Sequence, residues 1–313
     1  MKHSVVIPTV GRVEALIRCV DSIARQALAP CEVIIVACHN QEAVKQQVCS
    51  RHPSLPIVFL SSEICNSPHQ KNLGATRATG DIVDFLDDDV VLSDDYLRRI
   101  DETFTHYPEA VGVGGRIMEA EANRDWNFVL KLLRRCFLLN HNNGNGDFMA
   151  SSFPAMQFER DLSGETRTRL LVGCASYRSG LFKTFRYDEE LGKTLLWEDV
   201  DFAAMVSRKH VLYYQPLAIL THCHAPGGRP HVGLYAYRYL YNHHYLAHKH
   251  GRKGLMSFLG FWWGHLGALL AMVVKASGSG EKVLSIFPYI LRAEIDWVRR
   301  RQRHERRVAA TNS

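Results

Sequence analysis

Short apolar runs alternate with amphipathic stretches along the first two thirds of the chain. Strands are expected over residues 4–8, 32–37 and 56–60, because each is a continuous apolar run ended by polar or turn residues. From Val13 to Ala27, apolar residues recur three and four positions apart, which predicts a helix that packs by one face. Strands that alternate with helices are typical of βαβ units. The sequence therefore predicts an α/β domain built on a mostly parallel sheet.

Further elements follow the same pattern. Strands are expected over residues 81–86, 110–118, 171–178 and 211–221, and helices over residues 68–80, 126–139 and from residue 197 onward. Gly80 is expected to end the first of these helices as a C-cap. Ser93 is expected to begin another helix as its N-cap, with Asp94 and Asp95 favoured in the first turn by the helix dipole.

The last third of the chain has a different pattern. Residues 254–274 are an apolar stretch flanked by lysines and about long enough to cross a bilayer. If the preceding domain is cytoplasmic, a single crossing would export the Arg-rich segment 297–307, against the positive-inside rule. We therefore expect a helix in the membrane interface, with Trp262 and Trp263 at the level of the lipid headgroups. A helix that spans the bilayer and a helix docked on the catalytic domain are the alternatives.

This change of pattern predicts an α/β domain over residues 1–228 and a helical, membrane-associating region with a basic tail over residues 229–313. The composition, 46% apolar and 22% charged, is that of a globular protein. Segment 297–307 carries much of the net charge of +6, so no nucleic-acid partner is expected, and the segment fits an anionic membrane surface or a solvated tail. Because an apolar strand pattern begins at Ser4, no signal segment is expected and the catalytic part is expected to be intracellular.

Cysteines and histidines show no metal-binding pattern in the sequence. The eight cysteines include no CxxC pair, so reduced and mostly packed thiols are expected, without a zinc site or a disulfide framework. Segment 231–250 is rich in histidine and tyrosine, but no carboxylate stands near these histidines in the sequence. Helix packing beside the membrane explains these aromatic residues better than a metal site.

Three consecutive carboxylates, Asp87, Asp88 and Asp89, follow the predicted strand that begins near Asp81. Neighbouring like charges repel, so these side chains are either fully solvated or arranged around a cation. Open α/β sheets bind ligands at the carboxyl ends of their strands, and carboxylate oxygens are hard ligands that suit a hard ion. The sequence thus favours a divalent-metal site for a diphosphate over a solvated turn.

Two other segments carry candidate chemistry. Glu198 and Asp199 follow Trp197 at a predicted helix start, where they are either partners of the helix dipole or a general base beside an aromatic side chain. His222 and His224 follow the last predicted strand, where polar loop histidines and metal ligands are both possible.

Four segments stand in an order typical of one protein family. They are SVVIPTVGR at 4–12, KNLGATRATGDIVDFLDDDV at 71–90, GCASYRSGLF at 173–182 and WEDVDFAAMVSRKHVLYYQPLAILTH at 197–222. Together they resemble the family 2 inverting glycosyltransferases of the GT-A fold, and come closest to bacterial rhamnosyltransferase-like members that build surface polysaccharides. The resemblance covers roughly residues 4–224 and implies a Rossmann-like, mostly parallel sheet with flanking helices, to which a C-terminal helical extension is added.

The resemblance implies roles at a donor site. Pro8, Thr9 and Arg12 fall in the nucleotide-binding first loop, and Lys71 stands where a basic residue approaches the diphosphate. Asp88 is counted with the donor-binding residues, although alternation along a strand turns its side chain away from those of its neighbours.

A metal site is also implied. Asp87 and Asp89 match the DxD pattern, which contacts the nucleotide and holds the Mg²⁺ or Mn²⁺ that bridges the two phosphates. His222 is implied as a further metal ligand, with His224 as the alternate.

For catalysis, Asp199 matches the general base that takes the proton of an acceptor hydroxyl. Trp197, Glu198 and Cys174 are expected to shape the acceptor pocket. The segment 37–40 departs from the family, which usually has an acidic pair there to contact the nucleobase. His39 or Asn40 replaces that contact, or the donor is not a uridine nucleotide.

The resemblance implies a metal-dependent enzyme that moves a hexose or deoxyhexose from a nucleoside-diphosphate-sugar to a hydroxyl of a polysaccharide or lipid-linked glycan. Its expected place is the cytoplasmic face of the cytoplasmic membrane. The alternative is a catalytically inactive sugar-nucleotide-binding or scaffold protein of a membrane complex that assembles glycans.

Overall fold

The computed structural model describes residues 1–119, 128–194, 196–223, 231–278 and 282–311. The chain forms two compact units. The sheet unit comprises Met1–Asn123, Asn142–Asp147 and Ala155–Gly228, and the helical unit comprises Arg124–His141, Phe148–Pro154 and Arg229–Ser313. Residues 124–141 and 148–154 thus group with the C-terminal helices, whereas the sequence suggested a single division after residue 228.

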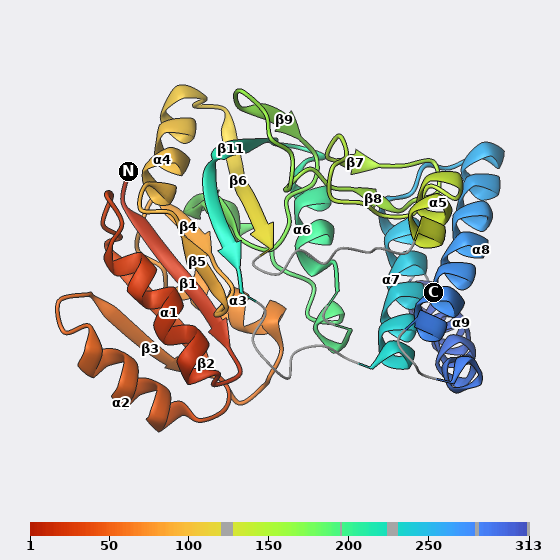
Figure 1. Cartoon of the computed structure of the whole chain (residues 1–313), viewed down its shortest axis with the longest axis horizontal. Coiled ribbons are helices and arrows are strands. Elements are labelled where there is room, and N and C mark those ends of the chain that lie inside the picture. Colours follow the sequence, from red (N-terminus) through yellow and green to blue (C-terminus); the bar gives the residue numbers. More distant parts are fainter. Residues whose placement is uncertain (120–127, 195, 224–230, 279–281, 312–313) are drawn as a thin grey trace. The chain divides into compact units, whose positions relative to one another are not determined.

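A mixed sheet forms the centre of the sheet unit, in the order β3-β2-β1-β4-β10-β6-β11-β5, with β9 paired to β11 (Figure 1). Its strands are β1 (His3–Thr9), β2 (Glu32–Ala37), β3 (Ile57–Ser61), β4 (Ile82–Phe85), β5 (Val90–Leu92), β6 (Ala110–Glu119), β9 (Thr166–Thr168), β10 (Ala175–Arg178) and β11 (Val211–His222). The first four strands are parallel to one another, as is β11 to β6, while β5, β9 and β10 run antiparallel to their neighbours. The predicted α/β fold class is confirmed.

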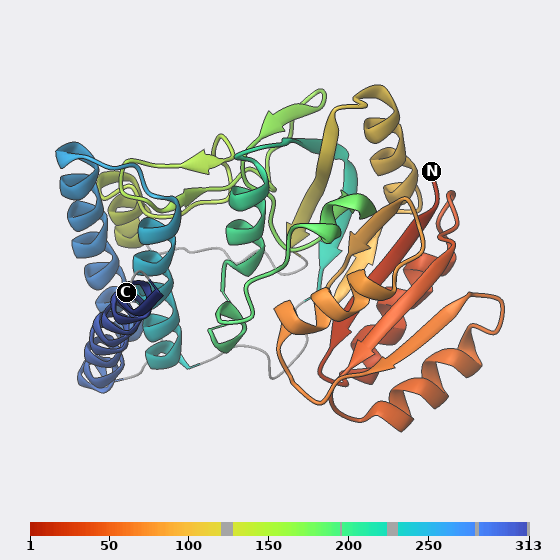
Figure 2. The same cartoon turned by 180° about the vertical axis from the view of Figure 1, so that it is seen from behind.

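Helices cover both faces of this sheet because the central strands are apolar on both sides. They are α1 (Val13–Ala24), α2 (Gln41–Arg51), α3 (Ser67–Arg77), α4 (Tyr96–His106) and α6 (Glu198–Val206), with short 3₁₀ turns η1 (Ser179–Lys183) and η2 (Leu191–Lys193). On β1, Val5 and Ile7 pack with α1 and α4 on one face, and Val6 packs with α3 and α6 on the other. Figure 2 shows α3 on the face opposite to α1.

Two predicted helix ends are wrong. Helix α3 ends at Arg77 with Ala78 as its C-cap, so Gly80 is not the cap. Gly80 instead lies against β1, where an added Cβ would stand 2.8 Å from the carbonyl oxygen of Lys2. Helix α4 begins at Tyr96, and Ser93 donates a hydrogen bond to the Asp95 carboxylate without acting as the N-cap.

The helical unit contains the long helices of the C-terminal third. They are α7 (Val232–His250), α8 (Leu255–Gly278) and α9 (Phe287–Thr311), with the turn η3 (Val283–Ile286) and the shorter α5 (Phe128–Cys136). Strands β7 (Asp147–Phe148) and β8 (Pro154–Ala155) pair as a small second sheet. In this unit α7 packs on both α8 and α9.

Helix α8 is long and apolar enough to cross a membrane, and about one third of its most apolar window is buried in the protein. Only the length and the composition of α8 support this possibility. The core helix of a soluble protein can be equally long and apolar. Trp262 and Trp263 are about half exposed, at 47% and 50%. Both side chains are thus partly accessible, although the ring of Trp263 also stacks on Phe137 with ring centres 4.6 Å apart.

Candidate active site

The triple acid lies on the turn that joins β4 to β5. Antiparallel pairing of β5 with β11 sets Val90 opposite His222, and the backbone N–H of Cys223 donates to the carbonyl oxygen of Asp89 over 2.8 Å. This register carries the His222 side chain to the acidic turn, where its Nε2 lies 3.2 Å from Oδ1 of Asp89. The end of one strand thus supplies a side chain to the turn before its neighbour.

Asp87, Asp89 and His222 converge, with one ligand atom of each within 4.8 Å of the others. Two carboxylates and an imidazole suit a divalent ion such as Mn²⁺ or Mg²⁺, so the donor set fits the implied metal. The alternate ligand His224 lies outside the described residues. Glu119, at the end of β6, places Oε1 3.7 Å from Nδ1 of His222, and nothing in the sequence marked it as part of this site.

The acidic residues around His222 determine its pKa. Burial would lower the pKa of His222, but hydrogen bonds to Asp89 and Glu119, together with the charges of Asp87 and Asp89, raise it to about 10. The imidazole is therefore surrounded by negative charge that favours a cation at this position.

Asp88 is not part of the group formed by Asp87, Asp89 and His222. Its carboxylate accepts a 2.5 Å hydrogen bond from Oγ1 of Thr9 and also contacts the guanidinium of Arg12. Arg12 reaches Asp89 as well, with Nη1 3.1 Å from Oδ2. The side chain of Asp88 is only 1% exposed, and burial raises its pKa although Arg12 opposes that rise.

Three residues assigned to donor binding from the sequence therefore form an internal support. Thr9 and Asp88 are buried, and Arg12 donates hydrogen bonds to the carboxylates of the turn. Pro8 is buried too, in β1 next to β2, where its Cα pairs with that of Val36. In this arrangement the contacts of Asp88 are with Thr9 and Arg12, and its side chain is only 1% exposed.

Lys71 and Asp199 form the second part of the site. Lys71 projects from α3 and is completely buried, and its Nζ lies 2.5 Å from Oδ1 of Asp199 at the start of α6. The same ammonium lies 3.8 Å from Oε1 of Glu198 and 5.2 Å from the centre of the Tyr187 ring. The sequence placed Lys71 near the diphosphate, whereas its closest contact is the carboxylate proposed as the base.

The protonation of this pair follows from its burial. Burial raises the pKa of Asp199 above the ordinary carboxyl range, the Lys71 charge acts against this rise, and the charges of Glu198 and Asp87 add to it. For Lys71, burial acts to lower the pKa, but Asp199, Glu198 and Asp87 raise it above its usual value. A carboxylate with a raised pKa is suited to take up a proton.

The chain bends sharply just before Asp199. Trp197 has a φ of 63°, in the left-handed region that non-glycine residues rarely adopt, and its side chain is 8% exposed. It precedes the first turn of α6 without a side-chain capping hydrogen bond. This local strain is typical of functional sites, and it directs Glu198 and Asp199 toward Lys71.

Cys174 does not line an acceptor pocket as expected. Its side chain is 1% exposed, and Sγ accepts a hydrogen bond from the backbone N–H of Asp87 over 3.4 Å. Burial raises the pKa of this thiol well above its usual value. Cys174 therefore supports the acidic turn by accepting this hydrogen bond. The expectation that it contacts the acceptor substrate is wrong.

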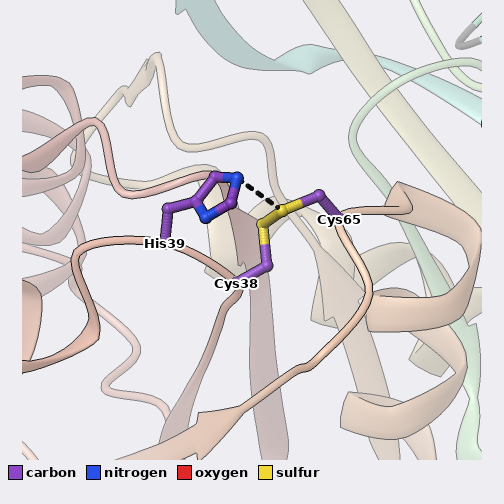
Figure 3. A group of neighbouring side chains, drawn as sticks. All are labelled: Cys38, His39 and Cys65. Carbon is purple, nitrogen blue, oxygen red and sulfur yellow. Dashed lines mark hydrogen bonds between the residues drawn. A yellow bond between two sulfur atoms is a disulfide. The ribbon is translucent and has the colours of Figure 1, made fainter.

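Segment 37–40, where the family resemblance implies a nucleobase contact, includes Cys38. This residue forms a disulfide with Cys65 (Figure 3). Nε2 of His39 lies 3.1 Å from Sγ of Cys65. The prediction of reduced thiols is wrong for this pair. The end of β2 and the loop before α3 bring together two cysteines that are 27 residues apart, and their spacing in the sequence does not reveal this contact. Asn40 adopts a φ of 48° and donates from Nδ2 to the carbonyl oxygen of Gly11 over 3.3 Å.

Comparisons with known proteins agree with this arrangement. One curated relative, the glucosyl-dolichyl phosphate glucuronosyltransferase of Haloferax volcanii, is 31% identical over 122 residues, which is 38% of this chain and 39% of the relative. A second relative is matched over 37% of its length. The chain thus spans less than half of the curated relatives that it matches.

Solved structures show the same fold at low sequence identity. S. aureus TarS residues 1–349 in complex with UDP-GlcNAc is 14% identical, with a TM-score of 0.62 over 95% of this chain and 81% of that one. The mannosyltransferase PcManGT of Pyrobaculum calidifontis, in complex with GDP-Man and Mn²⁺, is 16% identical, with a TM-score of 0.53 over 95% of this chain and 87% of that one. The family model described as glycosyl transferase family 2 matches residues 4–164, more than half of the 313 residues. The chain therefore belongs to glycosyl transferase family 2.

Proposed function

We propose that this protein is a metal-dependent, inverting glycosyltransferase that moves a sugar from a nucleoside-diphosphate-sugar to a hydroxyl of a polysaccharide or lipid-linked glycan. The observation that carries the proposal is the contact between the buried Lys71 and Asp199, whose pKa values respond to the charge of Asp87 in the neighbouring set. Family membership supports the transfer of a sugar. A hexose or deoxyhexose donor is supported by the rhamnosyltransferase-like motifs of the sequence alone.

The donor end of the reaction belongs to the acidic turn. Asp87, Asp89 and His222 would hold a Mn²⁺ or Mg²⁺ ion, which would neutralise charge on the diphosphate when bound. Arg12 holds the turn in shape by binding both Asp88 and Asp89. The turn is thereby fixed before a donor arrives, which lowers the cost of binding.

The acceptor end belongs to Asp199. An acceptor hydroxyl attacks the anomeric carbon from the face opposite the diphosphate, and its proton moves to a carboxylate oxygen of Asp199 as the bond to the diphosphate breaks. Lys71 holds that carboxylate in place through the 2.5 Å contact, which leaves the second oxygen to face the acceptor. No bond between the enzyme and the sugar is needed.

We place the protein at the cytoplasmic face of the cytoplasmic membrane through its helical unit. Besides Trp262 and Trp263, α8 exposes Phe258, at 58%, and Met256, at 79%. Exposed apolar side chains at this density on one helix are typical of a surface that lipid covers. Trp263 also donates from Nε1 to the carbonyl oxygen of Cys136, so its ring is held at the end of α5.

The alternative of an inactive sugar-nucleotide-binding or scaffold protein has less support. An inactive relative has no need to keep a fully buried lysine against a carboxylate, because an ammonium is costly to desolvate. Lys71 and Asp199 are both present and in contact.

The test is a panel of nucleotide-sugars, with release of the nucleoside diphosphate measured in the presence of Mn²⁺ or Mg²⁺ and a glycan extract. We expect release with at least one donor, and its loss in Asp199→Asn. The matched control is Asp94→Asn, since Asp94 lies near the acidic turn in sequence but its side chain is 73% exposed. No release with any donor, or release by Asp199→Asn equal to that of the control, would overturn the proposal.

A further inference from the structure

Three helices of the helical unit bring two histidines and a glutamate together. His244 lies on α7, His265 on α8 and Glu294 on α9. Nε2 of His244 is 2.8 Å from Oε2 of Glu294, and Nε2 of His265 is 3.1 Å from Oε1 of the same carboxylate. One ligand atom of each residue lies within 4.8 Å of the others. The carboxylate that the sequence did not reveal near these histidines comes from 50 residues beyond His244 and 29 residues beyond His265.

The surroundings of the cluster are apolar and aromatic. His244 and His265 are 7% and 3% exposed, respectively. The ring of His244 stacks on Trp297, with ring centres 5.5 Å apart, and the ring of His265 stacks on Phe261, with ring centres 5.6 Å apart. The Glu294 side chain is 35% exposed, so its carboxylate lies at the edge of this aromatic cluster and faces both histidines.

Hydrogen bonds to a neighbouring histidine determine which nitrogen of His265 carries its proton. Nε2 of His243 lies 2.8 Å from the carbonyl oxygen of Ser151, which can only accept, so this nitrogen is the donor. The ring of His243 is fully buried and stacked on Phe153, and with Nε2 as its donor it can accept at Nδ1. Nδ1 of His265 lies 3.3 Å from Nδ1 of His243 and is the donor in this arrangement.

With Nδ1 as its donor to His243, His265 directs Nε2 at Oε1 of Glu294, 3.1 Å away. A proton or a metal ion can join this nitrogen to the carboxylate. An extra proton on His265 would satisfy that one contact, whereas a metal ion would use both imidazoles and the carboxylate. A metal-binding histidine is usually held in place by a hydrogen bond from its other ring nitrogen, and the Nδ1–H of His265 makes such a bond to His243.

We propose that His244, His265 and Glu294 form a zinc site that ties α7, α8 and α9 together. Two imidazole nitrogens and one carboxylate oxygen are ligands that Zn²⁺ takes in proteins, with water in the fourth position. Mg²⁺ and Ca²⁺ prefer oxygen ligands, so neither is expected here. The site is separate from the acidic turn and does not depend on the proposed glycosyltransferase activity.

The test counts zinc in the full-length chain. Asp89→Asn serves as the parent, because it weakens the Asp87, Asp89 and His222 set and leaves the helical unit unchanged. After treatment with a chelator, addition of Zn²⁺ and desalting, we expect about one equivalent of zinc per chain. His265→Gln or Glu294→Gln in that parent should lose this zinc, and the control His248→Gln, at an exposed position of α7, should retain it.

A second measurement covers variants that fail to fold. Zn²⁺ should raise the Tm of the stripped parent by several degrees, Mg²⁺ should not, and Co²⁺ in the same site should give the visible spectrum of an imidazole-bound ion. If the parent binds no zinc and its Tm does not change when zinc is added, His265 and Glu294 form only an ion pair. Zinc binding that persists unchanged in a folded His265→Gln variant would equally overturn the proposal.

Discussion

The Nζ atom of Lys71 lies 2.5 Å from Oδ1 of Asp199, and the lysine side chain is completely buried. The two residues are 128 positions apart and come from α3 and α6, on the same face of the sheet. A buried ammonium in contact with a carboxylate stabilises the charged form of the carboxylate and fixes its direction. We therefore treat Lys71 as the residue that positions the proposed base.

Replacement of Lys71 by methionine should lower kcat and leave donor affinity largely unchanged. Methionine keeps most of the volume but removes the charged hydrogen bond, which is worth about 1.5–3 kcal/mol, or about 10- to 100-fold in rate. Steady-state kinetics with saturating donor would measure the effect. The matched control is Arg77→Met, an exposed position at the end of the same helix. If KM for the donor rises while kcat stays constant, Lys71 binds the diphosphate as the family resemblance implied.

The pH dependence of kcat should follow the raised pKa of Asp199. A base must be ionised to accept a proton, so activity should be full above this pKa and fall as the pH drops through it. Because burial raises the pKa, the acidic limb should lie above the ordinary carboxyl value of about 4. Lys71 acts to lower this pKa, so Lys71→Met should move the limb to still higher pH. A limb near the ordinary value, or one that does not move, would contradict the assignment of the base.

Local pattern was enough to predict most of the sheet. Strand β2 was predicted at its observed bounds, 32–37, because a strand buried on both faces is apolar at every position. The helix start at Glu198 and the meeting of Asp87, Asp89 and His222 also match what the motifs indicated. These features depend on residues close together in the chain or on a fixed order of motifs.

Contacts made through space were not predictable in the same way. The partners of Asp88 are Thr9 and Arg12, which stand before it by 79 and 76 residues. Cys174 carries the family motif but faces the backbone under the acidic turn, a direction that the sequence does not encode locally. The pairing of each of these residues is set by how β1, β4 and β10 lie together in the sheet.

Loss of Arg12 should destabilise the acidic turn. In Arg12→Met the buried carboxylate of Asp88 loses its cation, so the free energy of unfolding should fall, and the double variant with Asp88→Asn should lose less than the sum of the single changes. We expect a coupling of about 0.5–3 kcal/mol from urea unfolding of the four proteins in the cycle. Additive effects would show that Arg12 does not stabilise the turn through Asp88. Arg25→Met, an exposed arginine on the surface, provides the control.

The last prediction concerns the disulfide between Cys38 and Cys65. It ties the end of β2 to the loop before α3, in the segment where the family resemblance implies a contact with the nucleobase. Reduction, or Cys65→Ser, should free this loop and raise KM for the donor, while kcat at saturating donor should stay the same because Asp199 is on another element. The free energy of unfolding should fall by about 2–4 kcal/mol, as is typical of a lost disulfide.

Donor titrations with and without a reductant would measure the change in KM, and alkylation followed by mass spectrometry would confirm the state of the two thiols. Cys136→Ser is the matched control, since Cys136 is an exposed free thiol away from this loop. If the protein acts at the cytoplasmic face of the membrane, the reducing environment there opens the bond, and the reduced form is the one that sets donor affinity in the cell. Equal KM values for the oxidised and reduced proteins would show that the loop before α3 makes no contribution to donor binding.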